Sequence, residues 1–366
     1  MEPKTLAEHF SEIEDPRRTG FAHRHDLVEI LVITTCALFS EVEGFEDIAR
    51  WARVKESWLR RFLTLKNGIP SADTFARVFR LIDPKAFESA FRAWVGSTLP
   101  SFNQVAIDGK TLRGSADGDQ SPLHMVSAFA TEIGIVLGQE AVADKSNEIA
   151  AIPVLLEAMA IKGCLVSIDA MGCQKEIAST IRKRHADYLL AVKNNQRTLR
   201  SAVEDAFADV PMDGFEHTDR GHGRVVLQHV QVIENTGQVD SGTWVGCKRL
   251  GRIVSLRVEG EQRQVLETRY YISSAELTHE QLHAAARQHW GIENRLHWSL
   301  DVIFREDDAK IRKDHGPRNL ALIRKIILNM LRQDTKWPKV SLRGRRKMAG
   351  WDDDERMRVL GIKPLS

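Results

Sequence analysis

Two aspartates in this sequence each follow a short apolar run that predicts a buried strand. Asp108 comes at the end of NQVAIDGK and Asp169 at the end of CLVSIDAMG, and each is expected to end its strand and enter a turn. Strand ends within one sheet commonly converge at its edge. Two carboxylates held close together repel each other unless a cation neutralises them. Oxygen ligands of this kind favour magnesium or manganese over zinc.

A third acid lies in the segment HWGIENRLHW, residues 289–298, where Glu293 stands between two His-Trp pairs. Read as an α-helix, the segment begins a stripe of polar side chains at every fourth position: His289, Glu293, His297 and Asp301. Two interpretations are open. The tryptophans could pack into the core while the polar edge faces water, or the helix could hold the Glu293 carboxylate at the mouth of a site. Strand-Asp, strand-Asp and helix-Glu, in this order, favour metal-assisted phosphoryl transfer.

Histidines offer two other metal sites, both for zinc. The stripe itself, through His289, Glu293 and His297, could act as a helical zinc ligand set. A second set can be drawn from His217, His222 and His229. Neither the spacing of that second set nor any nearby cysteine supports it.

Polar and basic residues that follow the predicted strands are candidate contacts to a phosphate backbone. They are Lys110 and Arg113 after the first aspartate, and Lys193, Asn194 and Gln196 after the strand DYLLAVKN. The plain alternative for all five is a solvated surface.

Charge is divided unevenly along the 366 residues. Residues 101–309 carry 22 Lys and Arg against 29 Asp and Glu, a net charge of −7, whereas residues 310–366 carry 16 against 6, a net charge of +10. An acidic centre suits divalent cations, and a basic end suits a phosphate backbone or is simply solvated. The four cysteines are widely scattered, which argues against a disulfide framework and fits a reducing, cytoplasmic compartment. No signal peptide or membrane-spanning run is visible in the sequence.

The acids belong to the middle of a chain long enough for two or three domains. Residues 1–98 predict a compact helical domain, with a helix beginning near Pro70 and Ser71. Residues 99–335 alternate strands and helices, which predicts an α/β domain with a mixed sheet and helices on its faces. A β-rich insertion at about 213–274 precedes the helix that carries Glu293. Residues 336–366 are predicted to form a basic tail.

Several motifs spread over nearly the whole chain resemble the DDE transposases of bacterial insertion sequences, specifically the H-repeat-associated (ISAs-like) type. The most specific are RQHWGIENRLHWSLDVIFREDDAKIR around Glu293 and VAIDGKTLRGS around Asp108. The others are DPRR near residue 15, GIPSADTFARVFRLID, SIDAMGCQ, YLLAVKNNQ, the HGR at 222–224 and RYYISS.

The resemblance implies a catalytic domain similar to ribonuclease H, with the β-rich insertion before the last catalytic helix. It implies that Asp108, Asp169 and Glu293 form a metal-binding catalytic triad for two Mg²⁺ or Mn²⁺ ions. The expected activity is cleavage and joining of DNA at terminal inverted repeats and target DNA by a homodimer assembled on DNA. The protein would then work in the cytoplasm, at the nucleoid. On this view the two His-Trp pairs pack and orient the helix that presents Glu293.

The sequence departs from the wider group in one place. That group often carries Tyr, Arg and Lys at fixed spacing around its glutamate, and those positions hold Ala286, His289 and Leu300 here. His289 is therefore a candidate replacement for the arginine as a phosphate contact, and Arg295 is a further candidate DNA contact. Three nearby acids compete with Glu293 as the third ligand: Asp301, Glu306 and Asp307.

Two other functions remain compatible with these residues. One is a non-catalytic DNA-binding relic of a transposase that keeps its helical and basic surfaces. The other is a stand-alone nuclease that cuts DNA without joining it. The three acids do not separate a nuclease from a transposase, because water and a 3′-hydroxyl would use the same metals.

Overall fold

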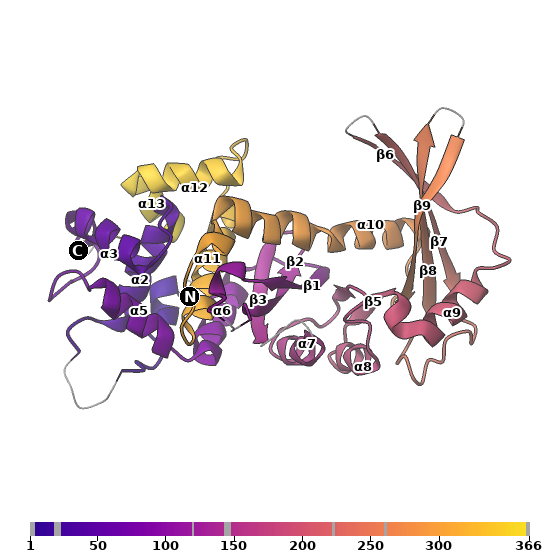
Figure 1. Cartoon of the computed structure of the whole chain (residues 1–366), viewed down its shortest axis with the longest axis horizontal. Helices are drawn as coiled ribbons and strands as arrows, with labels where there is room; N and C mark the ends of the chain where they lie inside the picture. The colour runs from indigo at the N-terminus through magenta and orange to yellow at the C-terminus, as the bar shows by residue number, and fades with distance from the viewer. Residues whose placement is uncertain are drawn as a thin grey trace.

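The computed structural model describes residues 4–17, 23–118, 121–142, 148–221, 224–259 and 262–363. Its centre is a nine-stranded sheet in the order β3-β2-β1-β4-β5-β9-β8-β7-β6 (Figure 1). The strands are β1 (Gln104–Thr111), β2 (His124–Ala130), β3 (Ile135–Val142), β4 (Leu165–Ile168), β5 (Asp187–Val192), β6 (Phe215–Gly221), β7 (Arg224–Glu234), β8 (Arg249–Glu259) and β9 (Gln262–Ser273). β1, β4 and β5 run parallel, and the other pairs are antiparallel. The predicted α/β fold with a ribonuclease H-like mixed sheet and a β-rich insertion is confirmed.

Strand β1 runs through the middle of this sheet. Its first half is fully buried at Val105, Ala106 and Ile107, as expected for a strand covered on both faces. The strand does not end at Asp108, as the sequence suggested, because pairing with β2 continues to Thr111 opposite His124. Gly109 is therefore not a turn residue. A Cβ on Gly109 would collide with the buried ion pair of His124 and Glu148, so glycine permits their close approach.

Helices cover both faces of the sheet. α7 (Glu148–Glu157) and α8 (Lys175–Lys183) lie on one side of the sheet, while α10 (His279–His289) crosses the other (Figure 1). α9 (Arg197–Ala206) packs against β9. Gln104 of β1 fixes α10 against the sheet. Its buried Nε2 donates to the carbonyl of Ala285 in α10 at 2.9 Å and to Ser167 Oγ in β4 at 3.0 Å.

The β-rich insertion extends the central sheet. β9 pairs with β5 from Leu189 opposite Ser273 to Val192 opposite Tyr270, and β8, β7 and β6 follow in antiparallel order. All four strands, β6 to β9, lie within the predicted β-rich insertion at about 213–274. The four strands stand upright at one end of the molecule (Figure 1).

The N-terminal region is helical, as predicted. It comprises α1 (Leu6–Phe10), α2 (Leu27–Ala37), α3 (Phe45–Val54), α4 (Glu56–Leu59), α5 (Ala72–Leu81) and α6 (Pro84–Thr98). The predicted start of α5 is confirmed, since the Ser71 side chain caps it by accepting from the backbone N–H of Thr74. Asp83 then caps α6, with Pro84 in its first position.

The segment predicted as a basic tail contains two helices, α12 (Leu342–Trp351) and α13 (Asp353–Leu360), which pack on the N-terminal helices. Arg346 donates to the carbonyls of Leu38 and Ile303. The Arg356 guanidinium is fully buried and lies 5.0 Å from the ring centroid of Trp51 and 5.1 Å from that of Trp58. Much of the positive charge at this end of the chain therefore has internal partners.

α11 (Gly316–Gln333) lies between the N-terminal helices and the sheet. Most of its side chains are buried, including Leu320, Ile323 and Ile327. In the described part of the chain, no helix is both long and apolar enough to cross a membrane.

Candidate active site

Asp108 and Asp169 lie side by side on neighbouring parallel strands. Ile107 of β1 pairs with Ile168 of β4, so the two aspartates are the next residues of each chain segment: Asp108 within β1, and Asp169 directly after the end of β4. The Asp169 carboxylate accepts backbone N–H bonds from Met171 at 3.0 Å and Gly172 at 3.3 Å, which fixes it in the turn after β4. Asp108 stays within β1 and is mostly buried. The predicted convergence of the two strand positions is thus present.

The segment after α10 carries Glu293, but it is not a regular α-helix. α10 ends at His289, and two π-helical segments follow, Ile292–His297 and Ser299–Ile303. π-helical turns hold more residues than the 3.6 of an α-helix and are frequent at functional sites. Residues spaced four positions apart therefore stay closer to one face of this segment than they would on an α-helix.

The predicted polar stripe does face the β1–β4 strand pair. His289 Nδ1 lies 3.2 Å from Ser167 Oγ, just before Asp169. His297 Nδ1 lies 3.6 Å from Asp108 Oδ2. Asp301 Oδ1 lies 2.8 Å from Lys110 Nζ. The stripe thus runs along the strand positions that carry the two aspartates.

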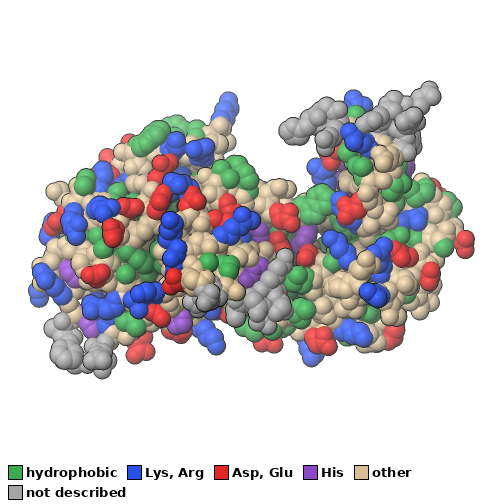
Figure 2. All heavy atoms as spheres, in the orientation of Figure 1, with side chains coloured by type: hydrophobic (Ala, Val, Ile, Leu, Met, Phe, Trp, Pro, Cys, Tyr) green, Lys and Arg blue, Asp and Glu red, His purple; other side chains and the backbone are tan. Residues whose placement is uncertain are grey.

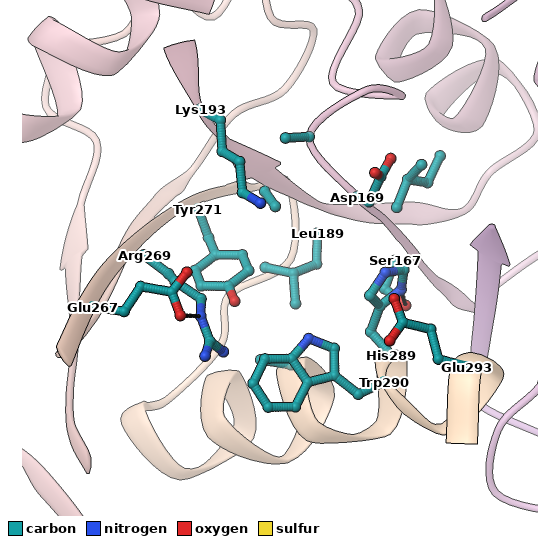
Figure 3. A pocket seen from close by; sticks show the side chains of 14 residues that line it. Ser167, Asp169, Leu189, Lys193, Glu267, Arg269, Tyr271, His289, Trp290 and Glu293 are labelled. Atoms are coloured by element: carbon teal, nitrogen blue, oxygen red, sulfur yellow. Dashed lines mark hydrogen bonds and ion pairs between the residues drawn. The ribbon is translucent and has the colours of Figure 1, made fainter. Parts of the chain in front are cut away.

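Glu293 is the exposed acid of this stripe. With Asp169 and Lys193 it lines a pocket of about 210 Å³ between β4, β5, β9 and the end of α10 (Figure 3). Its charge also acts on Asp108: burial, the charge of Asp169 and the charge of Glu293 together raise the pKa of Asp108 to about 7. No lysine or arginine in the described ranges forms an ion pair with any of these three carboxylates.

The donor set fits a hard divalent cation, although the side chains are not arranged as a finished metal site. Within the described residues, no three His, Cys, Asp or Glu side chains lie close enough together to hold a metal ion. Burial first, and then the charges of Asp169 and Glu293, nevertheless raise the pKa of Asp108. Carboxylate oxygens are the ligands that Mg²⁺ and Mn²⁺ prefer, and a bound cation would relieve the repulsion.

The three acids that competed with Glu293 have a different partner. The Lys110 ammonium lies 2.8 Å from Asp301, 3.2 Å from Glu306 and 3.0 Å from Asp307. Unlike these three acids, Glu293 forms no ion pair with a lysine or arginine among the described residues. The geometry therefore favours Glu293 as the third acid.

The two zinc hypotheses fit the structure poorly. In the β6–β7 pair, Glu216 is opposite His229 and His217 is opposite Gln228. Successive strand residues point to opposite faces, so His217 and His229 cannot reach one ion, and His222 lies outside the described residues. In the helical set, His289 faces Ser167 and His297 faces Asp108, and no zinc cluster forms among the described side chains.

The seven candidate phosphate contacts differ in how far the rest of the protein engages their side chains. The Arg113 side chain is 82% exposed, although its Nε lies 3.6 Å from Asp307 Oδ2, and Lys193 is exposed at the pocket. The remaining five have internal contacts: Lys110 with the three acids, Asn194 with Arg200, Gln196 with Cys173 and Gln174, His289 with Ser167, and Arg295 with the Thr131 carbonyl. Burial also lowers the pKa of His289, which disfavours a cationic imidazole. Their DNA contacts stay predictions.

Of the two interpretations of HWGIENRLHW, the one in which the tryptophans pack into the core is wrong. Trp290 is 38% exposed and Trp298 is 53% exposed. The Arg269 guanidinium lies 4.0 Å from the centroid of the Trp290 ring (Figure 3). The sequence pattern was interpreted with the α-helical period of 3.6 residues, and this period does not apply to the π-helical turns that follow α10. The outward orientation of the two tryptophans therefore could not be assigned from the sequence.

Sequence reasoning also missed residues that shape the site. β9 contributes Glu267, Arg269 and Tyr271 to the pocket wall. Asn195 Nδ2 donates to the carbonyl of Ala170 at 2.6 Å and so braces the turn that holds Asp169. The YLLAVKNNQ motif contained Asn195, but the partner in another turn could not be inferred from spacing.

Comparison with known proteins gives a consistent result over the whole chain. The family model "Transposase DDE domain" matches residues 100–330, and "DDE_Tnp_1-associated" matches residues 7–95. The chain is 40% identical to "H repeat-associated putative transposase YhhI" of Escherichia coli K12, with 100% of each chain covered. It is 38% identical to "Putative transposase YncI" of Escherichia coli O157:H7, covering 95% of this chain and 92% of that one. The cryo-EM structure of the piggyBac transposase synaptic complex with hairpin DNA is similar at a TM-score of 0.49 and 10% identity, over 97% of this chain and 79% of that one.

Proposed function

Because this chain belongs to the transposase DDE domain family, we propose that it cleaves and joins DNA strands at the ends of an insertion sequence in a metal-dependent reaction. Asp108, Asp169 and Glu293 are the proposed catalytic and metal-binding residues. The observation that carries the proposal is the pairing of Ile107 with Ile168, which brings Asp108 and Asp169 to adjacent positions, together with the pocket that Asp169 and Glu293 both line. This acidic cluster has no cation of its own among the described side chains.

Two Mg²⁺ or Mn²⁺ ions bound to these carboxylates would lower the pKa of an attacking water and stabilise charge on the transferring phosphoryl group. The chain's own residues prepare the place. Backbone N–H groups hold the Asp169 carboxylate, while β1 holds Asp108 rigidly. Glu293 approaches from the helical side. Lys193, exposed at the same pocket, is the proposed contact to the phosphate next to the reacting bond.

DNA, as terminal inverted repeats and target, is the proposed partner, bound by a homodimer of this chain. Lysine and arginine side chains are spread over the helical body in the face shown, and a hollow separates that body from the upright strands of the insertion (Figure 2). Surface charge of this kind supplies sequence-independent attraction to a phosphate backbone.

The test is a plasmid that carries the gene with its flanking DNA, incubated with the purified protein, Mg²⁺ and a target plasmid. The proposal expects cuts at fixed positions that bound the gene and products joined to the target. Cuts without joined products would instead indicate a stand-alone nuclease. A folded, DNA-binding protein that makes no Mg²⁺-dependent cut would contradict catalysis and indicate a relic.

Lowering the positive charge at the C-terminal end is expected to weaken DNA binding and its salt dependence. Truncation after residue 309 would remove the buried α11, so substitution of exposed residues is the cleaner change. Lys339 and Arg343 are exposed and Lys347 is half-buried, and none of the three has an internal partner among the described residues. Changing them to glutamine should make the slope of log K against log salt shallower by about 0.9 for each phosphate that the variant no longer neutralises.

Lys162→Gln is the control for this measurement. Lys162 is exposed and precedes β4, at the opposite end of that strand from Asp169. Equal slopes for the wild type and the C-terminal variant would show that these three side chains do not contact DNA.

A further inference from the structure

Lys110 is the centre of a buried ionic cluster next to the proposed active site. Its ammonium lies within 3.2 Å of Asp301, Glu306 and Asp307. We call Lys110 and these three acids the clasp. The Lys110 side chain is 9% exposed and that of Glu306 is 2% exposed. Three carboxylate groups around one ammonium compensate for the cost of burying its charge. The lysine is therefore a cation held inside the fold.

The clasp joins two segments that are far apart in the sequence. The backbone N–H of Arg113 donates to Asp307 Oδ1 at 3.2 Å. Gly114 approaches the same loop so closely that a Cβ there would collide with the carbonyl oxygens of Ala309 and Asp307. The chain just after Asp108 is thus fastened to the chain just after the π-helical segments that carry Glu293.

The position of the clasp gives it influence over the three acids. Lys110 lies two residues after Asp108 on β1, so both side chains point to the same face of the sheet. Asp301 lies on the same stripe as His297, which faces Asp108. The Lys110–Asp301 contact therefore connects the same strand and the same helical segment that must bring Asp108 and Glu293 together.

We infer that Lys110 is a positioning residue: through the clasp it sets the separation of Asp108 from the segment carrying Glu293, and so sets the affinity for the divalent cation. The inference rests on the proposed function. It also gives Lys110 a role other than a phosphate contact, because an ammonium enclosed by three carboxylates is not available to DNA. Residues that orient metal ligands typically change metal affinity about 10- to 100-fold when they are replaced.

The test compares Lys110→Met with Arg318→Met. Arg318 is a matched control, since it is also a mostly buried cation between two carboxylates, Glu88 and Glu140, and contacts none of the three acids. Thermal unfolding without metal and Mn²⁺ binding, measured by electron paramagnetic resonance, are the two readouts. Both variants should unfold at lower temperature. Only Lys110→Met should weaken Mn²⁺ binding, by about 10- to 100-fold.

Two additional variants keep the outcome interpretable. Lys110→Met frees three carboxylates that could bind Mn²⁺ themselves, so binding in the Lys110→Met, Asp108→Asn double variant is measured and subtracted. If Lys110→Met does not fold, Lys110→Arg is used, because it keeps the charge but places a larger, planar guanidinium in the clasp. Lys110→Arg should fold and still bind Mn²⁺ more weakly than the wild type.

Wild-type Mn²⁺ affinity in a folded Lys110 variant would overturn the inference. That result differs from failure of the proposed function. In the latter case Asp108→Asn alone would bind Mn²⁺ as the wild type does, or the wild type would not bind it at all.

Discussion

Changing Asp108, Asp169 or Glu293 to its amide is expected to leave folding and DNA binding nearly intact while reducing DNA cleavage by about 10³-fold or more. An amide has almost the same shape as the acid but binds a hard cation far less well. Metal ions contribute several kcal/mol to phosphoryl transfer, and about 1.4 kcal/mol corresponds to a factor of ten in rate. Magnesium-dependent nicking and a gel-shift assay, run on each variant, measure the two activities separately.

Asp301→Asn is the matched control for Glu293→Gln. Both residues lie on the stripe that faces β1 and β4, but Asp301 belongs to the clasp with Lys110. Asp301→Asn should therefore have a much smaller effect on nicking than Glu293→Gln. The reverse result, an inactive Asp301→Asn with a nearly normal Glu293→Gln, would move the third ligand to Asp301. Near-normal nicking by Asp108→Asn or Asp169→Asn would reject the triad itself.

Asp108→Asn should also make the metal-free protein more stable at pH 8 than the wild type. In the fold the pKa of Asp108 is raised from 3.8 to about 7, first by burial and then by the charges of Asp169, Glu293 and Glu148, while the neighbouring His297 is held neutral. Between these two values the folded chain binds a proton that the unfolded chain has released. Stability therefore falls as pH rises from about 4 to about 7.

The size of this effect can be bounded. Each unit of pKa corresponds to about 1.4 kcal/mol of folding stability. The raised pKa of Asp108 therefore lowers the stability of the metal-free wild type by on the order of 4 kcal/mol at alkaline pH. In thermal unfolding without metal, Asp108→Asn should exceed the wild type by several degrees at pH 8, and the difference should shrink toward pH 5. Mn²⁺ should raise the unfolding temperature of the wild type and leave that of Asp108→Asn nearly unchanged.

Asp205→Asn provides the control for this measurement, since Asp205 is an exposed residue of α9. It should unfold as the wild type does at every pH. A stability difference between Asp108→Asn and the wild type that does not change with pH would mean that the pKa of Asp108 is not raised in the folded chain.

The sequence was sufficient to predict the sheet and the convergence of Asp108 and Asp169, because the signals were local. Apolar runs before Asp108 and Asp169 indicated strands, and parallel neighbours bring such positions together. The end of β1 was placed wrongly, because Asp-Gly usually signals a turn, whereas Gly109 instead makes room for His124 and Glu148. That contact joins residues from β2 and α7, and no local pattern records it.

The partners of charged residues were the least predictable part. Lys110 follows Asp108 in a basic-looking motif, and a lysine there is compatible with a phosphate contact. Its actual partners, Asp301, Glu306 and Asp307, lie nearly two hundred positions later in the chain, and only the fold brings them to β1. The same holds for Arg356, whose burial beside Trp51 could not be read from a charge run.

The packing of α12 and α13 against the N-terminal helices has a consequence for synthesis of the chain on the ribosome. The hydrogen bond from Ser40 Oγ to the Gly350 carbonyl joins residues 310 positions apart. At about 5 to 20 residues per second, translation needs roughly 15 to 60 s to cover that distance. Throughout this interval the first helices lack the side chains that complete their core. A nascent chain thus carries the three acids without a finished helical body, and full assembly waits until α12 and α13 have left the ribosome.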